Sequence, residues 1–97
     1  MVFLREERRV IRLGYRYFHP LVASVRTVKM RSLGQSGLEV SRLALGTMTW
    51  GRDTDEHEAA VQLRAYLDAG GNLLDTAAVY ADGDSERVIG GFLGTLV

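Results

Sequence analysis

Two polar side chains suited to acid–base chemistry follow an apolar stretch in the second half of the chain. Asp75 ends the run Leu73-Leu74-Asp75, and Tyr80 stands five residues further on. A carboxylate that ends a buried strand needs a cation or several hydrogen-bond donors. A phenol has a pKa near about 10, so Tyr80 acts as an acid near neutral pH only beside a cation. Because Lys29 is the sole lysine, we expect this cation to be missing or to lie in sequence beyond these 97 residues.

Simpler roles account for the same two residues. Asp75 can cap its own loop through a hydrogen bond to a nearby amide, and Tyr80 can line a surface as an amphipathic side chain. No G-x-G-x-x-G or G-x-x-x-x-G-K-[ST] pattern occurs, so neither a Rossmann fingerprint nor a P-loop is supported. The absence of cysteine excludes a thiolate zinc site, and His19 and His57 have no partner at ligand spacing, so no metal is expected.

The elements that must position these residues alternate between strands and helices. Two glycines bracket a Gln-Ser pair, which predicts a β-hairpin over residues 32–41. Short apolar strands are predicted at residues 42–47 and 72–77, each followed by a polar loop. Functional residues of parallel α/β sheets lie where the strands end, so the candidate loops are residues 46–51 and 75–80.

An amphipathic helix is predicted after each of these strands. The first begins at a cap within residues 53–55 and ends at Gly70-Gly71. Its apolar face consists of Ala59, Ala60, Leu63, Tyr66 and Leu67. Asp84 or Ser85 is expected to cap the second helix. The apolar face of that helix consists of Val88, Ile89, Phe92, Leu93 and Leu96.

The order of elements predicts an α/β fold, a hairpin followed by two βα units of a parallel sheet with right-handed crossovers. Two parallel strands leave open hydrogen-bonding edges, and the apolar helix faces have little to cover. A closed barrel of eight strands and eight helices needs about 250 residues, and this chain has 97. We therefore expect the beginning of a larger α/β protein that is poorly folded and inactive alone.

Charge divides the chain into two segments. Residues 1–30 carry seven cations against two carboxylates, and residues 31–97 carry five against ten. We interpret residues 1–29 as a poorly ordered basic extension before an α/β unit at residues 30–97. Met30 marks the change, which favours a translation start there; peptide mapping that detected earlier residues would contradict this. No basic groove follows the extension, so no nucleic-acid partner is expected.

Composition bounds the cellular context. The chain has no cysteine, which favours a reducing cytoplasm. No apolar run approaches the length of about 18 residues that a membrane helix requires, and the N-terminus lacks the pattern of a secretory signal. The oligomeric state does not follow from the sequence.

Three segments between residues 30 and 94 resemble the N-terminal part of the aldo-keto reductases. Residues 33–43, LGQSGLEVSRL, are similar to the opening hairpin of that family. Residues 45–51, LGTMTWG, are similar to its first barrel strand and cofactor-side loop. Residues 71–80, GNLLDTAAVY, continued by Gly83-Asp84-Ser85-Glu86 and Gly90, resemble its catalytic signature.

The resemblance implies a (β/α)8 TIM barrel that reduces small aldehydes and ketones with a nicotinamide cofactor, usually NADP(H). By position, Tyr80 corresponds to the general acid that protonates the carbonyl oxygen, and Asp75 to the residue that holds the catalytic lysine. Thr47, Met48 and Asp75 correspond to residues beside the nicotinamide. Trp50 and Tyr80 correspond to residues that border the substrate.

The chain also departs from the family pattern. The lysine and histidine of the family come from later strands, so the resemblance implies an inactive N-terminal fragment with half of the catalytic quartet. Gly71 replaces the larger apolar residue usual before the asparagine, which predicts a small packing loss. The family also includes potassium-channel β-subunits, so the alternative is a non-catalytic interaction module with a basic N-terminal arm. Neither the substrate nor the preference between NADP and NAD is predicted.

Overall fold

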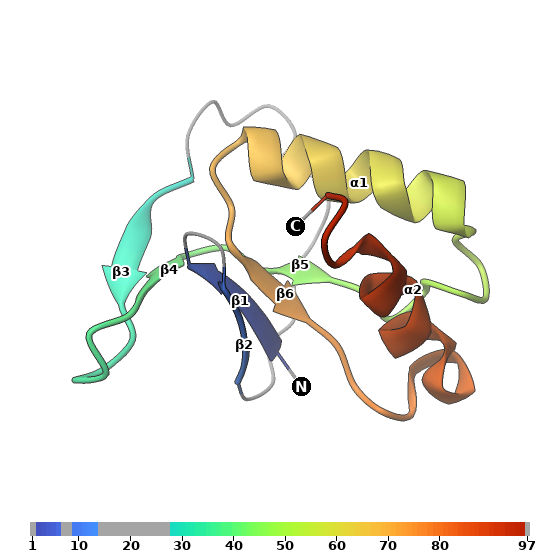
Figure 1. Ribbon diagram of the computed structural model, residues 1–97, viewed down its shortest axis with the longest axis horizontal. Helices are drawn as coiled ribbons and strands as arrows, with labels where there is room; N and C mark the ends of the chain where they lie inside the picture. Colours follow the sequence, from blue (N-terminus) through green and yellow to red (C-terminus); the bar gives the residue numbers. More distant parts are fainter. Residues whose placement is uncertain (1, 7–8, 14–27, 97) are drawn as a thin grey trace.

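The computed structural model describes residues 2–6, 9–13 and 28–96 (Figure 1). Its strands are β1 (Val2–Glu6), β2 (Arg9–Leu13), β3 (Met30–Ser32), β4 (Glu39–Ser41), β5 (Leu45–Gly46) and β6 (Leu73–Asp75). Its helices are α1 (Glu56–Asp68), the short 3₁₀ helix η2 (Tyr80–Gly83) and α2 (Asp84–Phe92). One sheet has the strand order β2-β1-β6-β5, and β3 and β4 form a second sheet.

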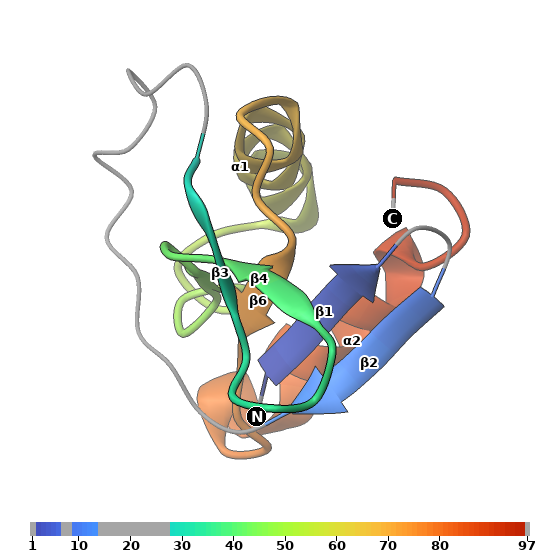
Figure 2. The ribbon, with the colours of Figure 1, turned by 90° about the vertical axis from the view of Figure 1, so that its left-hand side faces the viewer.

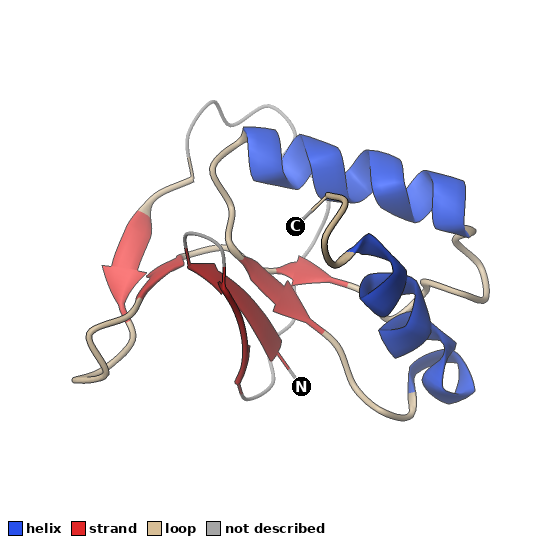
Figure 3. Ribbon diagram, in the orientation of Figure 1, coloured by secondary structure: helices blue, strands red, loops and turns tan. Residues whose placement is uncertain are grey.

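The arrangement is α/β, and the part of the chain that the structure describes contains no closed barrel. α1 lies beside β5 and β6, while α2 and the β3–β4 hairpin lie at opposite ends of the molecule (Figure 3). The hairpin confirms the turn prediction: Ser32 lies opposite Glu39, and the amide of Leu33 donates to the carbonyl of Leu38 at 2.8 Å.

β5 and β6 pair in parallel, which confirms the pairing predicted from the alternation of strands and helices. Leu45 lies opposite Leu74, and Gly46 lies opposite Asp75. Both strands are shorter than predicted, and both have buried residues. The parallel pairing brings the carboxyl ends of the two strands to one edge of the sheet.

The four-stranded sheet takes two strands from the segment that we interpreted as a basic extension, residues 1–29. β1 runs antiparallel to β6, with residues 2–4 opposite residues 73–75, and β2 pairs with the other side of β1 (Figure 2). Residues 14–27 of the extension lie outside the described part of the chain. The edge of β6 that the sequence leaves open is therefore occupied by β1.

α1 begins and ends where the sequence predicts. Asp55 is the N-cap: its side chain accepts from the amide of Glu58, and the Glu58 side chain accepts from the amide of Asp55. This reciprocal capping box satisfies two amides that a helix start leaves without an intrahelical partner. The C-cap is Ala69, after which Gly70 has the left-handed φ of 91°. The predicted apolar face packs inward, with Ala59, Leu63 and Tyr66 buried and Ala60 and Leu67 half-buried.

α2 differs from its prediction at both ends. The N-cap is Gly83, with a φ of 93° and no side-chain cap, rather than Asp84 or Ser85. The side chain of Asp84 instead forms an ion pair with Arg87. The helix ends at Phe92, because Leu93 is extended. The predicted apolar face is thus confirmed for Ile89 and Phe92, which are buried, whereas Leu93 is 41% exposed.

A network at the amino end of β6, which we call the amino-end network, consists of Ser41, Leu43, Tyr66 and Leu73. The buried hydroxyl of Tyr66 lies 2.6 Å from the Leu43 carbonyl and 2.7 Å from the Ser41 hydroxyl. The same hydroxyl accepts from the Leu73 amide at 3.1 Å. The network fixes α1 against the start of β6 and the end of the β3–β4 hairpin.

The ring of Tyr66 also explains Gly71. A Cβ atom added to Gly71 would lie 2.2 Å from ring atoms of Tyr66, which is far inside van der Waals contact. The packing loss expected at Gly71 is therefore absent, because the tyrosine ring fills the space that a larger side chain would take.

Candidate functional site

The two candidate loops start side by side at the carboxyl ends of β5 and β6. The amide of Thr47, just after β5, donates to the carbonyl of Asp75 at 3.1 Å. The hydroxyl of Thr47 donates to the same carbonyl at 2.9 Å. The residues that begin the two candidate loops, 46–51 and 75–80, are thus hydrogen-bonded to each other, and the functional role of these loops stays a prediction.

A network of buried hydroxyl groups joins these loops to α2. Ser85 Oγ donates toward Thr47, with the carbonyl oxygen at 2.8 Å and Oγ1 at 2.9 Å. Thr76 Oγ1 lies 3.0 Å from Ser85 Oγ. All three side chains have zero exposure. We call Thr47, Thr76 and Ser85 the carboxyl-end network, and it fixes the backbone on which Asp75 stands.

Asp75 lies at the end of β6 and is 1% exposed. A carboxylate at such a depth keeps its charge only when the surrounding groups compensate for the lost hydration. Its main-chain carbonyl is held by two donors from Thr47. The geometry therefore presents an acidic side chain on a backbone that has little freedom to move.

Tyr80 begins η2 and is half-buried, and its amide donates to the carbonyl of Ala77 at 3.1 Å. The next three residues, Ala81, Asp82 and Gly83, have φ values of 49°, 55° and 93°. Left-handed backbone costs a residue with a side chain about 1–2 kcal/mol. Such strain gathers at functional sites in proteins, and here it directly follows Tyr80 and turns the chain into α2.

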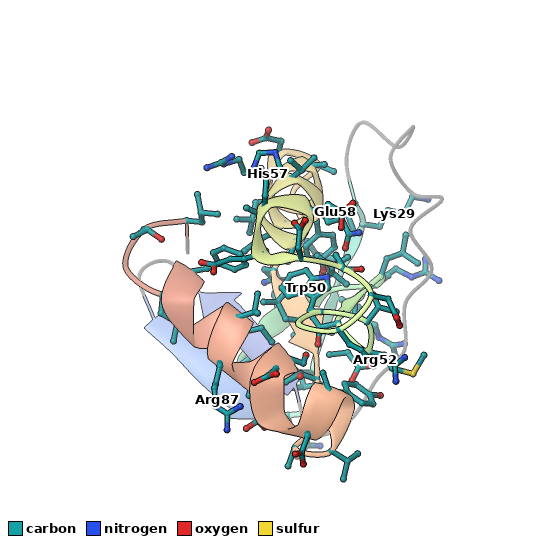
Figure 4. The ribbon with its side chains drawn as sticks, turned by 90° about the vertical axis from the view of Figure 1, so that its right-hand side faces the viewer. Lys29, Trp50, Arg52, His57, Glu58 and Arg87 are labelled. Atoms are coloured by element: carbon teal, nitrogen blue, oxygen red, sulfur yellow. The ribbon has the colours of Figure 1, made fainter. Side chains whose placement is uncertain are left out.

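Met48 and Trp50 lie in the same loop but in different surroundings. The Met48 side chain is 46% exposed. Trp50 has zero exposure, its indole N–H donates to Gln62 at 2.8 Å, and its ring meets that of Phe92 edge to face at 6.0 Å. Figure 4 shows Trp50 between α1 and α2. The structure thus places Trp50 in the core, and its role beside a substrate stays a prediction.

Known sequences assign the family. The sequence profile described as Aldo/keto reductase family matches residues 42–95, more than half of the chain. The chain belongs to this family. The match includes β5, α1, β6, η2 and α2, and therefore both candidate loops.

Curated relatives match segments of similar length. The chain is 44% identical over 64 residues to a probable voltage-gated potassium channel subunit beta of Oryza sativa subsp. japonica, covering 65% of this chain and 20% of that protein. It is 44% identical over 63 residues to human aflatoxin B1 aldehyde reductase member 2, covering 63% and 18%. It is 42% identical over 64 residues to the aldo-keto reductase YhdN of Bacillus subtilis, covering 61% and 19%. The chain thus spans about a fifth of these relatives, and no solved structure matches it.

Two residues of the candidate site were missed by sequence reasoning about chemistry. Thr76 follows Asp75 directly, and Ser85 was expected only as a helix cap. The signal that could have found them is the position of small hydroxyl residues just after two adjacent strands and at the start of the next helix.

Metal and membrane features complete the description. Among residues 2–6, 9–13 and 28–96, no three His, Asp or Glu side chains gather in a way that could hold a metal ion. Within the same residues, no helix has the length and apolar character needed to cross a bilayer.

Proposed function

We propose that this chain carries the first two βα units, β5–α1 and β6–α2, of a (β/α)8 reductase that acts on small aldehydes and ketones. The observation that carries the proposal is the placement of Asp75 and Tyr80: a buried carboxylate ends β6, and a half-buried phenol follows on a strained turn. Membership of the aldo-keto reductase family supports the same roles for these two residues.

When bound, a reduced nicotinamide cofactor, NADPH or NADH, would supply the hydride for reduction of the carbonyl carbon. Tyr80 gives its phenolic proton to the carbonyl oxygen. Its pKa must fall from about 10 for this to occur near neutral pH, which requires a cation beside the phenolate. Asp75 holds that cation in place through opposite charge.

The residues near the strand ends fit a nicotinamide in part. Met48 is 46% exposed and Val79 is 81% exposed, so each leaves an apolar side chain on which a flat ring can pack. Thr47 and Asp75, in contrast, are buried. We therefore assign Met48 the contact with the cofactor, while Thr47 and Asp75 position the loop and the charge.

The proposed site needs partners beyond this chain's own lysine. The backbone of Val28, next to Lys29, donates to Ala69 at the end of α1. Lys29 thus adjoins the amino side of β6, whereas Tyr80 follows its carboxyl end. We expect that the 97-residue chain alone oxidises no NADPH in the presence of a simple aldehyde such as 4-nitrobenzaldehyde. Turnover that disappears in the Tyr80→Phe variant would contradict the proposal that the site is incomplete.

A chimera tests the proposed roles directly. Residues 42–95 would replace the matching segment of the Bacillus subtilis relative YhdN, which supplies the remainder of a complete reductase. We expect the chimera to reduce the aldehyde, and Tyr80→Phe within it to lower kcat by about 10²–10⁴. The control His57→Ala changes an exposed residue of α1 (Figure 4) and should leave kcat unchanged. A folded chimera that is equally active with Tyr80→Phe would overturn the assignment.

The alternative function is a non-catalytic interaction module. The rice relative is named as a probable channel subunit, and the first 30 residues carry seven cations. Under this alternative the chimera folds without reductase activity, and deletion of residues 1–29 abolishes binding to a partner. Under the reductase proposal the chimera, which contains none of residues 1–29, is active, and deletion of residues 1–29 from the chain leaves partner binding unchanged.

A further inference from the structure

The edge of β6 that faces away from β5 has backbone groups that need hydrogen-bond partners. The carbonyl of Asp75 faces β5, where it accepts from Thr47. The amide and carbonyl of Leu73 both reach the hydroxyl of Tyr66, at 3.1 and 3.0 Å. Because backbone groups alternate sides along a strand, the amide and carbonyl of Leu74 face the opposite edge. Leu74 is 6% exposed, and buried backbone groups without partners are costly.

β1 pairs with this edge along the full length of β6. Phe3 lies opposite Leu74, and its neighbours Val2 and Leu4 lie opposite Asp75 and Leu73. The pairing is antiparallel, so no crossover helix is needed to bring the strand into place. β1 is itself paired with β2 over five residues, so the edge receives a hairpin rather than a lone strand.

The new outer edge is less suited to further pairing than the edge it replaces. β2 has the sequence Arg-Val-Ile-Arg-Leu, with Arg9 and Arg12 among its five residues. Charged residues on an edge strand disfavour the addition of another chain. β6, in contrast, consists of two leucines and a buried aspartate.

We infer that β1 and β2 form an intramolecular cap, a pair of antiparallel strands that occupies the strand-binding edge of β6 and prevents a second copy of the chain from pairing there. The basic segment thereby has a structural function, which is to supply the strand that pairs with β6 on the side away from β5. The inference rests on strand register and burial, and it holds whether or not Tyr80 acts as an acid.

Hydrogen exchange of single amides tests the cap. In the full chain we expect the Leu74 amide to be protected. Deletion of residues 1–13 or the variant Phe3→Pro, which removes the amide opposite Leu74, should speed its exchange by about tenfold or more. The Asp75 amide, on the β5 side, is the internal control and should change far less. Phe3→Val keeps the amide and should behave as the parent chain does.

Two further measurements separate loss of the cap from loss of the fold. A synthetic peptide of residues 1–13, added to the deletion variant, should restore the protection of Leu74. Sedimentation should give one chain per particle for the parent and two for the deletion variant at high concentration. A Leu74 amide that exchanges equally fast in the parent chain and in Phe3→Pro would overturn the cap, as would a parent chain that is already dimeric.

Discussion

The two ends of β6 are both held by buried hydroxyl groups, but the two networks differ in construction. In the amino-end network the central hydroxyl belongs to the large ring of Tyr66. That hydroxyl contacts backbone atoms of Leu43 and Leu73. In the carboxyl-end network three small side chains bond to one another and to the backbone at Thr47 and Asp75. The packing of the amino end depends on the volume of the Tyr66 ring as well as on hydrogen bonds. The packing of the carboxyl end depends on hydrogen bonds between small side chains.

The two networks also differ in their relation to the candidate site. The amino-end network includes Ser41, the last residue of β4, and none of its members belongs to a candidate loop. The carboxyl-end network contains the residues that follow β5 and β6, and it holds the backbone that carries Asp75. Changes at the amino end should therefore lower the stability of the whole fold, and changes at the carboxyl end should act first on the candidate site.

The largest expected effect is that of Gly71→Ala, which puts a methyl group into the ring of Tyr66. The added Cβ would lie 2.2 Å from ring atoms, and overpacking of this kind costs about 3 kcal/mol at the upper end of its usual range. Urea unfolding followed by the fluorescence of Trp50, the sole tryptophan, measures the loss.

Another glycine provides the matched control for this substitution. Gly90 lies in α2, and an added Cβ there meets nothing within 4 Å. Gly90→Ala should therefore be neutral or stabilise the chain by about 0.5–1 kcal/mol. If Gly71→Ala also costs nothing, or costs the same in a Tyr66→Leu background, the tyrosine ring is not the reason for glycine at this position.

The next largest effect is expected for Tyr66→Phe, which removes the hydroxyl of the amino-end network and keeps the ring. The Leu73 amide loses its hydroxyl partner, whereas the Ser41 hydroxyl keeps its bonds to Leu43 and Asn72. Leaving a buried polar group unpaired costs about 2 kcal/mol. Amide exchange should accelerate at Leu73 and stay nearly unchanged at Thr47.

The same residue gives the amino end a dependence on pH. Burial raises the pKa of Tyr66 above its ordinary value, against the opposing effect of its hydrogen bonds to Ser41 and to the backbone. The folded chain therefore holds this proton more tightly than the unfolded chain does. The stability that Tyr66 contributes is complete below about pH 10 and falls as the pH rises through the folded pKa. A stability curve for Tyr66→Phe that falls equally steeply above pH 10 would contradict this origin.

Local signals in the sequence predicted the parts of the fold that depend on neighbouring residues. Asp55 and Glu58 mark the start of α1 because the capping box spans only four positions. The paired glycines mark the β3–β4 turn for a similar reason. The candidate loops followed from the rule that parallel strands place chemistry at their carboxyl ends, which requires no knowledge of packing.

Distant contacts account for what the sequence left unpredicted. The pairing of β1 with β6 joins residues about seventy positions apart, and the charge of the first segment conceals its capacity to form strands. Ser85 is a residue type that commonly caps helices, but its hydroxyl donates a hydrogen bond to the carbonyl of Thr47 instead. The loop that contains Trp50 suggests a binding role for it. Its indole N–H instead bonds to Gln62 and its ring packs against Phe92 in the core.

The smallest global effect, and the most local one, is expected for Ser85→Ala. The substitution removes the hydroxyl that joins α2 to Thr47 and Thr76, and it should cost about 1 kcal/mol. Because Thr47 is freed while Tyr66 keeps all its partners, exchange should accelerate at the Thr47 amide and not at the Leu73 amide, the reverse of Tyr66→Phe. The matched control is Ser36→Ala, which removes an exposed hydroxyl that bonds only within the β3–β4 turn. Equal acceleration at Thr47 and Leu73 would show that the two ends of β6 open together, and the separation of site and scaffold would then be wrong.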